Sequence, residues 1–131
     1  MPFFDHLGIS TADLPRGIRQ WHPILAALGF ERSDAENSVA WYREGDPEFI
    51  IYGAREPDSG PHHHGRVGWQ HLALTLESRA EVDRLHGIAR EAGWTVVREP
   101  KEYPRFSHHY YASFVEDADG IRLEFMNQRF D

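Results

Sequence analysis

The sequence lacks cysteine, long apolar segments and clusters of basic residues. The absence of cysteine excludes disulfides, thiolate chemistry and cysteine-type zinc sites, so any metal ion must bind to histidine and carboxylate side chains. No segment approaches the roughly 18 apolar residues that a membrane-spanning helix needs, and the opening residues do not resemble a secretory leader. We therefore expect a soluble, cytoplasmic protein without a membrane partner.

Positive charge is also scarce, since 14 Lys and Arg residues stand against 21 Asp and Glu residues and the net charge is −7. Without a basic block, contacts to a phosphate backbone cannot supply the main binding energy, which argues against a nucleic-acid partner. Hydrophobic residues make up 40% of the 131 residues and aromatic residues 13%, a composition typical of a globular chain. This length predicts one domain over residues 1–131.

The two halves of the chain resemble each other at an offset of about 65 residues. The segments Asp5–Ser10 and Gln70–Thr75 both read polar, histidine, leucine, small, aliphatic, hydroxyl. This alternation is typical of a strand, and it places His6 and His71 on one face while the leucine after each of them points to the other face. The repeat therefore predicts two related modules, each with a histidine near its start.

Each of these strands leads into an amphipathic helix that ends at a glycine. The first helix is expected over Pro15–Leu28, with Thr11 or Asp13 as its N-cap, and the second over Arg79–Ala92, with Ser78 as its N-cap. Their apolar residues recur on one side, so both helices are expected to cover the leucine-rich faces of the strands.

Three short strands are expected after each helix, which gives the order strand, helix, three strands in both halves. They are expected at Glu31–Ser33, Val39–Arg43, Phe49–Tyr52, Thr95–Arg98, His109–Val115 and Ile121–Met126. The sequence thus predicts an α+β chain with one βαβββ module at 1–54, a linker at 55–68 that is rich in Gly, Pro and His, and a second module at 69–131. Within the linker, His62–His64 is interpreted as a solvated loop.

The last predicted strand contains Glu124, a carboxylate that can form one site together with the two histidines. Leu123 and Phe125 alternate with Glu124, so the carboxylate is expected to face the same cavity as His6 and His71. A carboxylate buried without a partner costs several kcal/mol, which favours a bound cation or a water-filled cleft over a dry core there. A single strand histidine is usually structural, but matching positions in two repeats, together with one glutamate, favour a divalent metal site.

The segments Asp5–Ile9, Gln70–Ala73 and Phe114–Glu124 together resemble the vicinal oxygen chelate superfamily, which includes glyoxalases, bleomycin resistance proteins and extradiol dioxygenases. The resemblance covers nearly the whole chain and implies the glyoxalase-like fold, in which two βαβββ modules form a cupped, barrel-like mixed sheet. It implies that His6, His71 and Glu124 are the metal ligands. It also implies a homodimer, with the site built within one chain or across two.

One position departs from glyoxalase I, which carries a further Glu or Gln ligand on the last strand of its first module. Alignment of the repeats places Ile50 there, and isoleucine cannot bind a metal. A metal site with three protein ligands and open coordination positions resembles the sites of extradiol dioxygenases and fosfomycin-modifying enzymes more closely. The resemblance thus implies a metal-dependent lyase or isomerase, or a ring-cleaving dioxygenase, that acts on a small oxygen-rich molecule with Fe, Mn, Ni, Co or Zn. The alternative is a bleomycin-resistance-like protein that sequesters a small molecule without turnover.

Further candidates for the site flank these ligands. With Glu124, the catalytic candidates are His109, Tyr110 and Tyr111, of which strand alternation sends only one tyrosine inward. The candidates for substrate contact are Ile50, Tyr52, Ser113 and Arg122. Packing or exposure is an alternative role for each of them.

Overall fold

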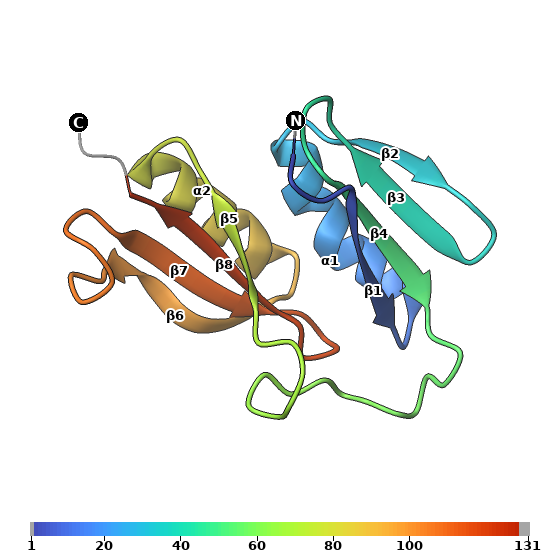
Figure 1. The fold of residues 1–131 in the computed structure, drawn as a ribbon. Helices are drawn as coiled ribbons and strands as arrows, with labels where there is room; N and C mark the ends of the chain where they lie inside the picture. The colour runs from blue at the N-terminus through green and yellow to red at the C-terminus, as the bar shows by residue number, and fades with distance from the viewer. Residues whose placement is uncertain (1, 129–131) are drawn as a thin grey trace. The chain divides into compact units, whose positions relative to one another are not determined.

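The computed structural model describes residues 2–128 and divides into two compact units, Met1–Pro61 and His62–Asp131 (Figure 1). The first unit contains β1 (His6–Thr11), α1 (Leu14–Ala27), β2 (Glu31–Asp34), β3 (Ser38–Tyr42) and β4 (Glu48–Gly53). The second contains β5 (Leu72–Thr75), α2 (Arg79–Glu91), β6 (Thr95–Glu102), β7 (Tyr111–Glu116) and β8 (Arg122–Asn127). Each unit therefore has the predicted order of strand, helix and three strands.

The two units have the same sheet topology. Their strand orders are β1-β4-β3-β2 and β5-β8-β7-β6, and each sheet is mixed because its first strand runs parallel to its last while the other pairs are antiparallel. This confirms the α+β class and the two βαβββ modules. In each module the first and last strands of the chain segment are neighbours, so residues distant in sequence meet on one sheet face.

In the first unit, α1 covers one face of the sheet. Asp13 is the N-cap, and its carboxylate accepts a hydrogen bond from the backbone N–H of Arg16 at 3.1 Å. Helix residues Trp21, Ile24 and Leu25 are buried together with strand residues of β3 and β4. The helix thus takes the covering role predicted from its apolar stripe, and the other sheet face carries His6.

In the second unit, α2 packs on β6, β7 and β8 in the same way. Ser78 is its N-cap and accepts a hydrogen bond from the backbone N–H of Glu81 at 3.1 Å, as the capping-box spacing predicts. The fully buried side chains of this core include Val82, Leu85, Val115, Leu123 and Phe125. Because Leu123 and Phe125 point toward α2, Glu124 between them points to the opposite face.

Several strand boundaries differ from the prediction by one residue, and those of β6 and β7 near the candidate site differ by two or more. β6 continues past Arg98 to Glu102 and includes Pro100, which is tolerated because β6 is an edge strand with register shifts on both sides of Arg98. β7 begins at Tyr111, two residues later than expected, so Tyr110 belongs to the loop before it. That loop adds aromatic residues to one edge of the sheet.

Candidate functional site

Glu124 is the centre of the candidate site in the second unit. It lies on β8 and pairs with Ala73 of β5 on one side and Phe114 of β7 on the other. The residue is only 2% exposed. A charge at this depth needs partners, because an unpaired buried carboxylate strongly destabilises a fold.

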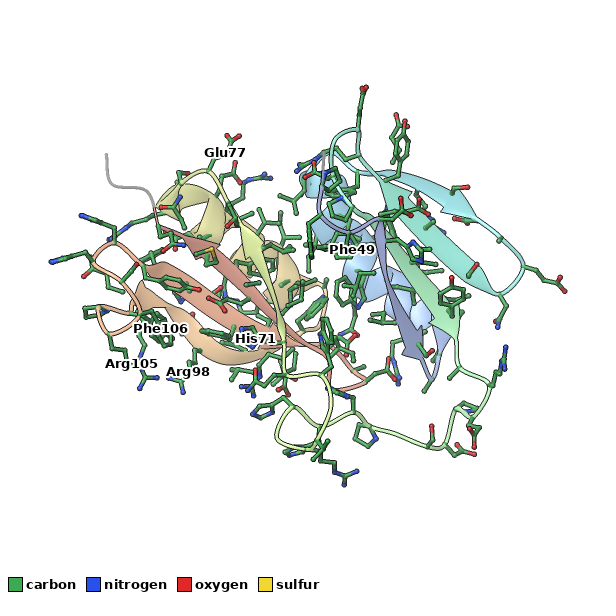
Figure 2. All side chains as sticks on the ribbon, viewed as in Figure 1. Phe49, His71, Glu77, Arg98, Arg105 and Phe106 are labelled. Carbon is green, nitrogen blue, oxygen red and sulfur yellow. The ribbon has the colours of Figure 1, made fainter. Side chains whose placement is uncertain are left out.

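His71 is one of these partners. It precedes β5 (Figure 2). Its imidazole Nε2 lies 2.9 Å from Oε1 of Glu124. Its other ring nitrogen, Nδ1, forms a short contact with Oε1 of Gln70. The His71 side chain is 34% exposed, so the pair joins a buried carboxylate to an imidazole that solvent and small molecules can reach.

Tyr110 is the second partner of the carboxylate. Its hydroxyl donates a hydrogen bond to Oε2 of Glu124 at 2.5 Å. Burial, followed by the hydrogen bond to Glu124 and the negative charge of that residue, raises the pKa of Tyr110 well above its ordinary value. The phenol therefore keeps its proton at neutral pH and holds one oxygen of Glu124, while the other oxygen faces His71.

Aromatic side chains surround this polar group. The Phe114 ring lies edge-on to the imidazole of His71, with 5.8 Å between the ring centroids. Phe114 also meets Tyr103 edge-on at 5.9 Å, and Phe106 meets Tyr110 at 5.2 Å. The site is thus a small polar centre in an apolar wall, the composition expected of a small-molecule site.

The first unit holds the matching histidine, His6 on β1. Its Nδ1 lies 2.8 Å from Oδ2 of Asp5, so in both modules the residue before the histidine holds Nδ1. Metal-binding histidines commonly have such a partner, which orients the ring and leaves Nε2 for the ion. The sequence carried this signal as the polar residue that opens each repeat, although its role was not predicted.

The strand register also fixes the position of Ile50. Ile50 pairs with Gly8 of β1, just as Glu124 pairs with Ala73 of β5. The two positions are therefore equivalent in the two modules, as the repeat alignment predicted. Tyr52 lies two residues further along the same strand, and its ring is 3.3 Å from where a Cβ on Gly8 would be, so it covers the β1 face that carries His6.

The structure places other candidates away from Glu124. Tyr111 and Ser113 lie on the α2 face of the sheet, where the Tyr111 hydroxyl donates to Oδ1 of Asp83 at 2.7 Å. Ser113 is fully buried beside Phe125 and is therefore separated from the Glu124 face, contrary to its expected role in substrate contact. Tyr110 is thus the tyrosine that reaches the site.

Two further candidates, Arg122 and His109, have other neighbours. Arg122 shares the face of Glu124, but its guanidinium is held by Glu116 at 2.7 Å and 2.8 Å. His109 is exposed in the loop, with its ring centroid 5.9 Å from that of His108. Neither side chain has a described contact to the His71–Glu124 pair.

The donors of the pair suit a divalent metal ion. With Nδ1 facing the oxygen of Gln70 and Nε2 facing Glu124, both contacts are satisfied either by a protonated imidazole or by a cation shared between Nε2 and Glu124. The observed 2.9 Å is an ordinary N–H···O distance, and it is also close to the ~3 Å between two ligands that each lie ~2.1 Å from an ion and ~90° apart. Within residues 2–128, however, no three His, Asp or Glu side chains gather closely enough to hold an ion.

Comparison with known proteins gives one consistent result. The model of the Glyoxalase/Bleomycin resistance protein/Dioxygenase superfamily matches residues 3–125. The uncharacterized protein YqjT of Bacillus subtilis is 29% identical over 120 residues, which cover 91% of this chain and 94% of YqjT. Neither described helix is long and apolar enough to cross a membrane.

Solved structures share the fold at lower identity. A glyoxalase/bleomycin resistance protein from Albidiferax ferrireducens has a TM-score of 0.79 at 19% identity, over 98% of this chain and 100% of that one. A glyoxylase/bleomycin resistance protein/dioxygenase domain from Frankia has a TM-score of 0.76 at 21% identity, over 98% and 99%. By its sequence match over nearly its whole length, this chain belongs to the glyoxalase/bleomycin resistance protein/dioxygenase superfamily.

Proposed function

We propose that the protein is a metal-dependent enzyme that acts on a small oxygen-rich molecule, with one divalent ion held by His6, His71 and Glu124. The observation that carries this proposal is the 2.9 Å contact between Nε2 of His71 and Oε1 of the buried Glu124. The ion is Fe, Mn, Ni, Co or Zn, all of which accept imidazole and carboxylate ligands.

The residues around the ligands have positioning roles in this proposal. Asp5 and Gln70 hold Nδ1 of the two histidines, so both rings present Nε2. Tyr110 donates to one oxygen of Glu124 and leaves the other free to bind. When bound, the ion would act as a Lewis acid toward vicinal oxygen atoms of the substrate. Because Tyr110 keeps its proton at neutral pH, its hydroxyl serves as a donor and not as a base.

Ile50 bears on the type of reaction. An apolar residue at the position equivalent to Glu124 leaves three protein ligands, which keeps coordination positions open for a chelating substrate. This supports ring-cleaving dioxygenase chemistry or a lyase or isomerase reaction that differs from that of glyoxalase I. Oxygen uptake with catechols would identify the first, whereas consumption of a hemithioacetal without oxygen uptake would identify the glyoxalase I reaction and contradict this interpretation of Ile50.

The metal assignment is tested by removing each ligand. The protein is purified without a nickel column, because His62–His64 can retain nickel, and its metal content is measured by mass spectrometry. Wild type should hold one ion per site, and the variants His6→Ala, His71→Ala and Glu124→Ala should each lose most of it. His108→Ala and Glu77→Ala change the same residue types at exposed positions and should keep it. Full metal content in His71→Ala and Glu124→Ala would reject the assignment.

The aromatic wall supports a second candidate function, the binding of a planar small molecule without turnover. Phe106 is 50% exposed and presents its ring beside Tyr110, while Tyr103 and Phe114 are buried and pack around it and His71. Equilibrium dialysis with a candidate ligand before and after chelation separates the two functions. Retention that is unchanged after metal removal supports sequestration, whereas retention that depends on the ion supports the enzyme.

We also propose a homodimer, on the basis of the family resemblance. The metal ligands come from both modules, and relatives complete their sites either within a chain or across two chains. Sedimentation equilibrium of the purified protein tests this expectation. A mass close to twice the 15.2 kDa of one chain supports the dimer, and a mass of one chain at all concentrations contradicts it.

A further inference from the structure

A second feature of the same unit is a pocket on β6 and the loop after it. The pocket has a volume of about 420 Å³ and is lined by Arg98, Lys101, Glu102, Tyr103, Pro104 and Arg105. Arg98 and Arg105 lie on the same side of the unit as Phe106 (Figure 2). Three of the lining side chains are cations, a high local density in a chain whose net charge is −7.

None of these three cations forms an ion pair with another described residue. Within residues 2–128, no carboxylate lies within ion-pair distance of Arg98, Lys101 or Arg105. Glu102, the one acid of the pocket, is instead paired with Arg79 of α2 at 2.7 Å. The pocket thus keeps a concentrated positive charge, and such a concentration attracts anions.

Stacked aromatic rings hold two of the cations in place. Nζ of Lys101 lies 5.1 Å from the ring centroid of Tyr103, and the guanidinium of Arg105 lies 5.1 Å from that of Phe106. The two rings stack on each other with centroids 5.3 Å apart. The buried hydroxyl of Tyr103 has no hydrogen-bond partner among the described residues. An anion would therefore meet partly ordered donors, which lowers the entropic cost of binding.

The same rings connect the pocket to the candidate metal ligands. Tyr103 contacts Phe114, which contacts His71, and Phe106 contacts Tyr110, which binds Glu124. Arg98 pairs with Phe114 across the strands, so it lies on the sheet face that carries Glu124. The pocket and the His71–Glu124 pair thus share one aromatic wall within the second unit.

We propose that this pocket binds an anionic group, a carboxylate or a phosphate, of the small molecule whose oxygen-rich part reaches His71 and Glu124. The role of Arg98, Lys101 and Arg105 as an anion subsite stands on the pocket itself, while the link to turnover rests on the proposed function. The pocket has the size of a site for one small-molecule group, and its charge selects against neutral and cationic substrates.

The subsite is tested first by titrating metal-free, full-length protein with inorganic phosphate and with malonate, followed by amide NMR shifts. The double variant Arg98→Gln/Arg105→Gln removes two pocket cations, and the control Arg84→Gln/Arg90→Gln removes two exposed cations of α2. We expect saturable shifts on β6 and its loop for at least one anion. Affinity should fall at least ~10-fold in the pocket variant and less than ~2-fold in the control, in line with two lost charge-assisted contacts.

Three outcomes would overturn the subsite. These are shifts that do not saturate, an equal loss of affinity in the pocket and control variants, and saturation by the polyanion heparin but by neither small anion. Metal content is measured in the same variants and should stay at the wild-type level. If His71→Ala loses its metal but still binds phosphate, the metal site and the anion subsite are each supported independently. If wild type binds phosphate but contains no metal, only the metal site is rejected.

Discussion

The imidazole of His71 and the carboxylate of Glu124 lie 2.9 Å apart although 53 residues separate them in the sequence. Parallel pairing of β5 with β8 brings them together, since Ala73 and Glu124 are partners in that register. Gln70 holds the far nitrogen of the imidazole and Tyr110 the far oxygen of the carboxylate. The pair is therefore oriented from both ends, an arrangement that is common among metal-binding histidines.

The hydrogen bond from Tyr110 should stabilise the metal-free fold measurably. Tyr110→Phe leaves one oxygen of a buried carboxylate without its donor, and a hydrogen bond to a charged group contributes about 1–3 kcal/mol. Urea unfolding of the metal-free protein should show a loss of that size. Tyr42→Phe removes an exposed hydroxyl and should change the unfolding free energy by less than about 0.5 kcal/mol. Equal stability of Tyr110→Phe and wild type would mean that this contact does not form in solution.

Metal binding should be visible as thermal stability. An ion that binds only the folded state adds about 2.7 kcal/mol at roughly 100-fold its Kd, or about 10 °C in Tm for a chain of this size. Calorimetry with Mn²⁺, followed by EDTA, should show this shift and its reversal in wild type. In Glu124→Gln the shift should largely vanish, because the amide is a far weaker ligand. A shift of the same size in both proteins would place the ion elsewhere.

Much of the fold is readable from local sequence signals. Ser78 caps α2 through the backbone N–H three residues on, as the capping-box spacing predicts, and of the two candidates Thr11 and Asp13 it is Asp13 that caps α1 in the same way. Glu124 faces away from α2 because alternation between Leu123 and Phe125 decides the face of every residue on β8. These predictions depend on short range geometry and were confirmed.

The contacts around Glu124 were harder to predict from the sequence. The choice between Tyr110 and Tyr111 depends on where β7 begins, and the cross-strand register fixes that point. Ser113 lies on the α2 face for the same reason. The cationic pocket arises from the irregular path of β6 around Pro100, where no periodic pattern marks which of its side chains converge. Tertiary pairing thus decides what local propensity leaves open.

The contact between Tyr111 and Asp83 predicts a pH effect. Burial, followed by the hydrogen bond to Asp83, raises the pKa of Tyr111 from 10.0 to about 12. Since folding favours the protonated phenol, this contribution to stability is fully present below pH ~10 and is lost as the pH rises toward ~12. Phenolate absorbance should include a titration step near this higher pH. Tyr111→Phe should remove that step, whereas Tyr42→Phe should leave it in place. A step near pH ~12 that persists in Tyr111→Phe would contradict the assignment.

Gly120, in the turn between β7 and β8, should tolerate no side chain. Its φ is +83°, and a Cβ there would lie 2.1 Å from the carbonyl oxygen of His62. The backbone N–H of His62 also donates to the carbonyl of Asp119 at 2.8 Å, so the linker is fastened to this turn and cannot easily give way. Gly120→Ala should therefore combine left-handed strain with a backbone clash and cost about 2–5 kcal/mol in urea unfolding.

Gly45 provides the matched comparison for this turn. Its φ of +87° is nearly the same, but nothing lies within 4 Å of an added Cβ, so Gly45→Ala should cost only the strain of about 1–2 kcal/mol. The difference between the two variants isolates the contact with His62. Equal losses would show that the linker does not close on this turn in solution. A larger loss in Gly120→Ala, accompanied by weaker metal binding, would show that the turn positions β8 and thus Glu124.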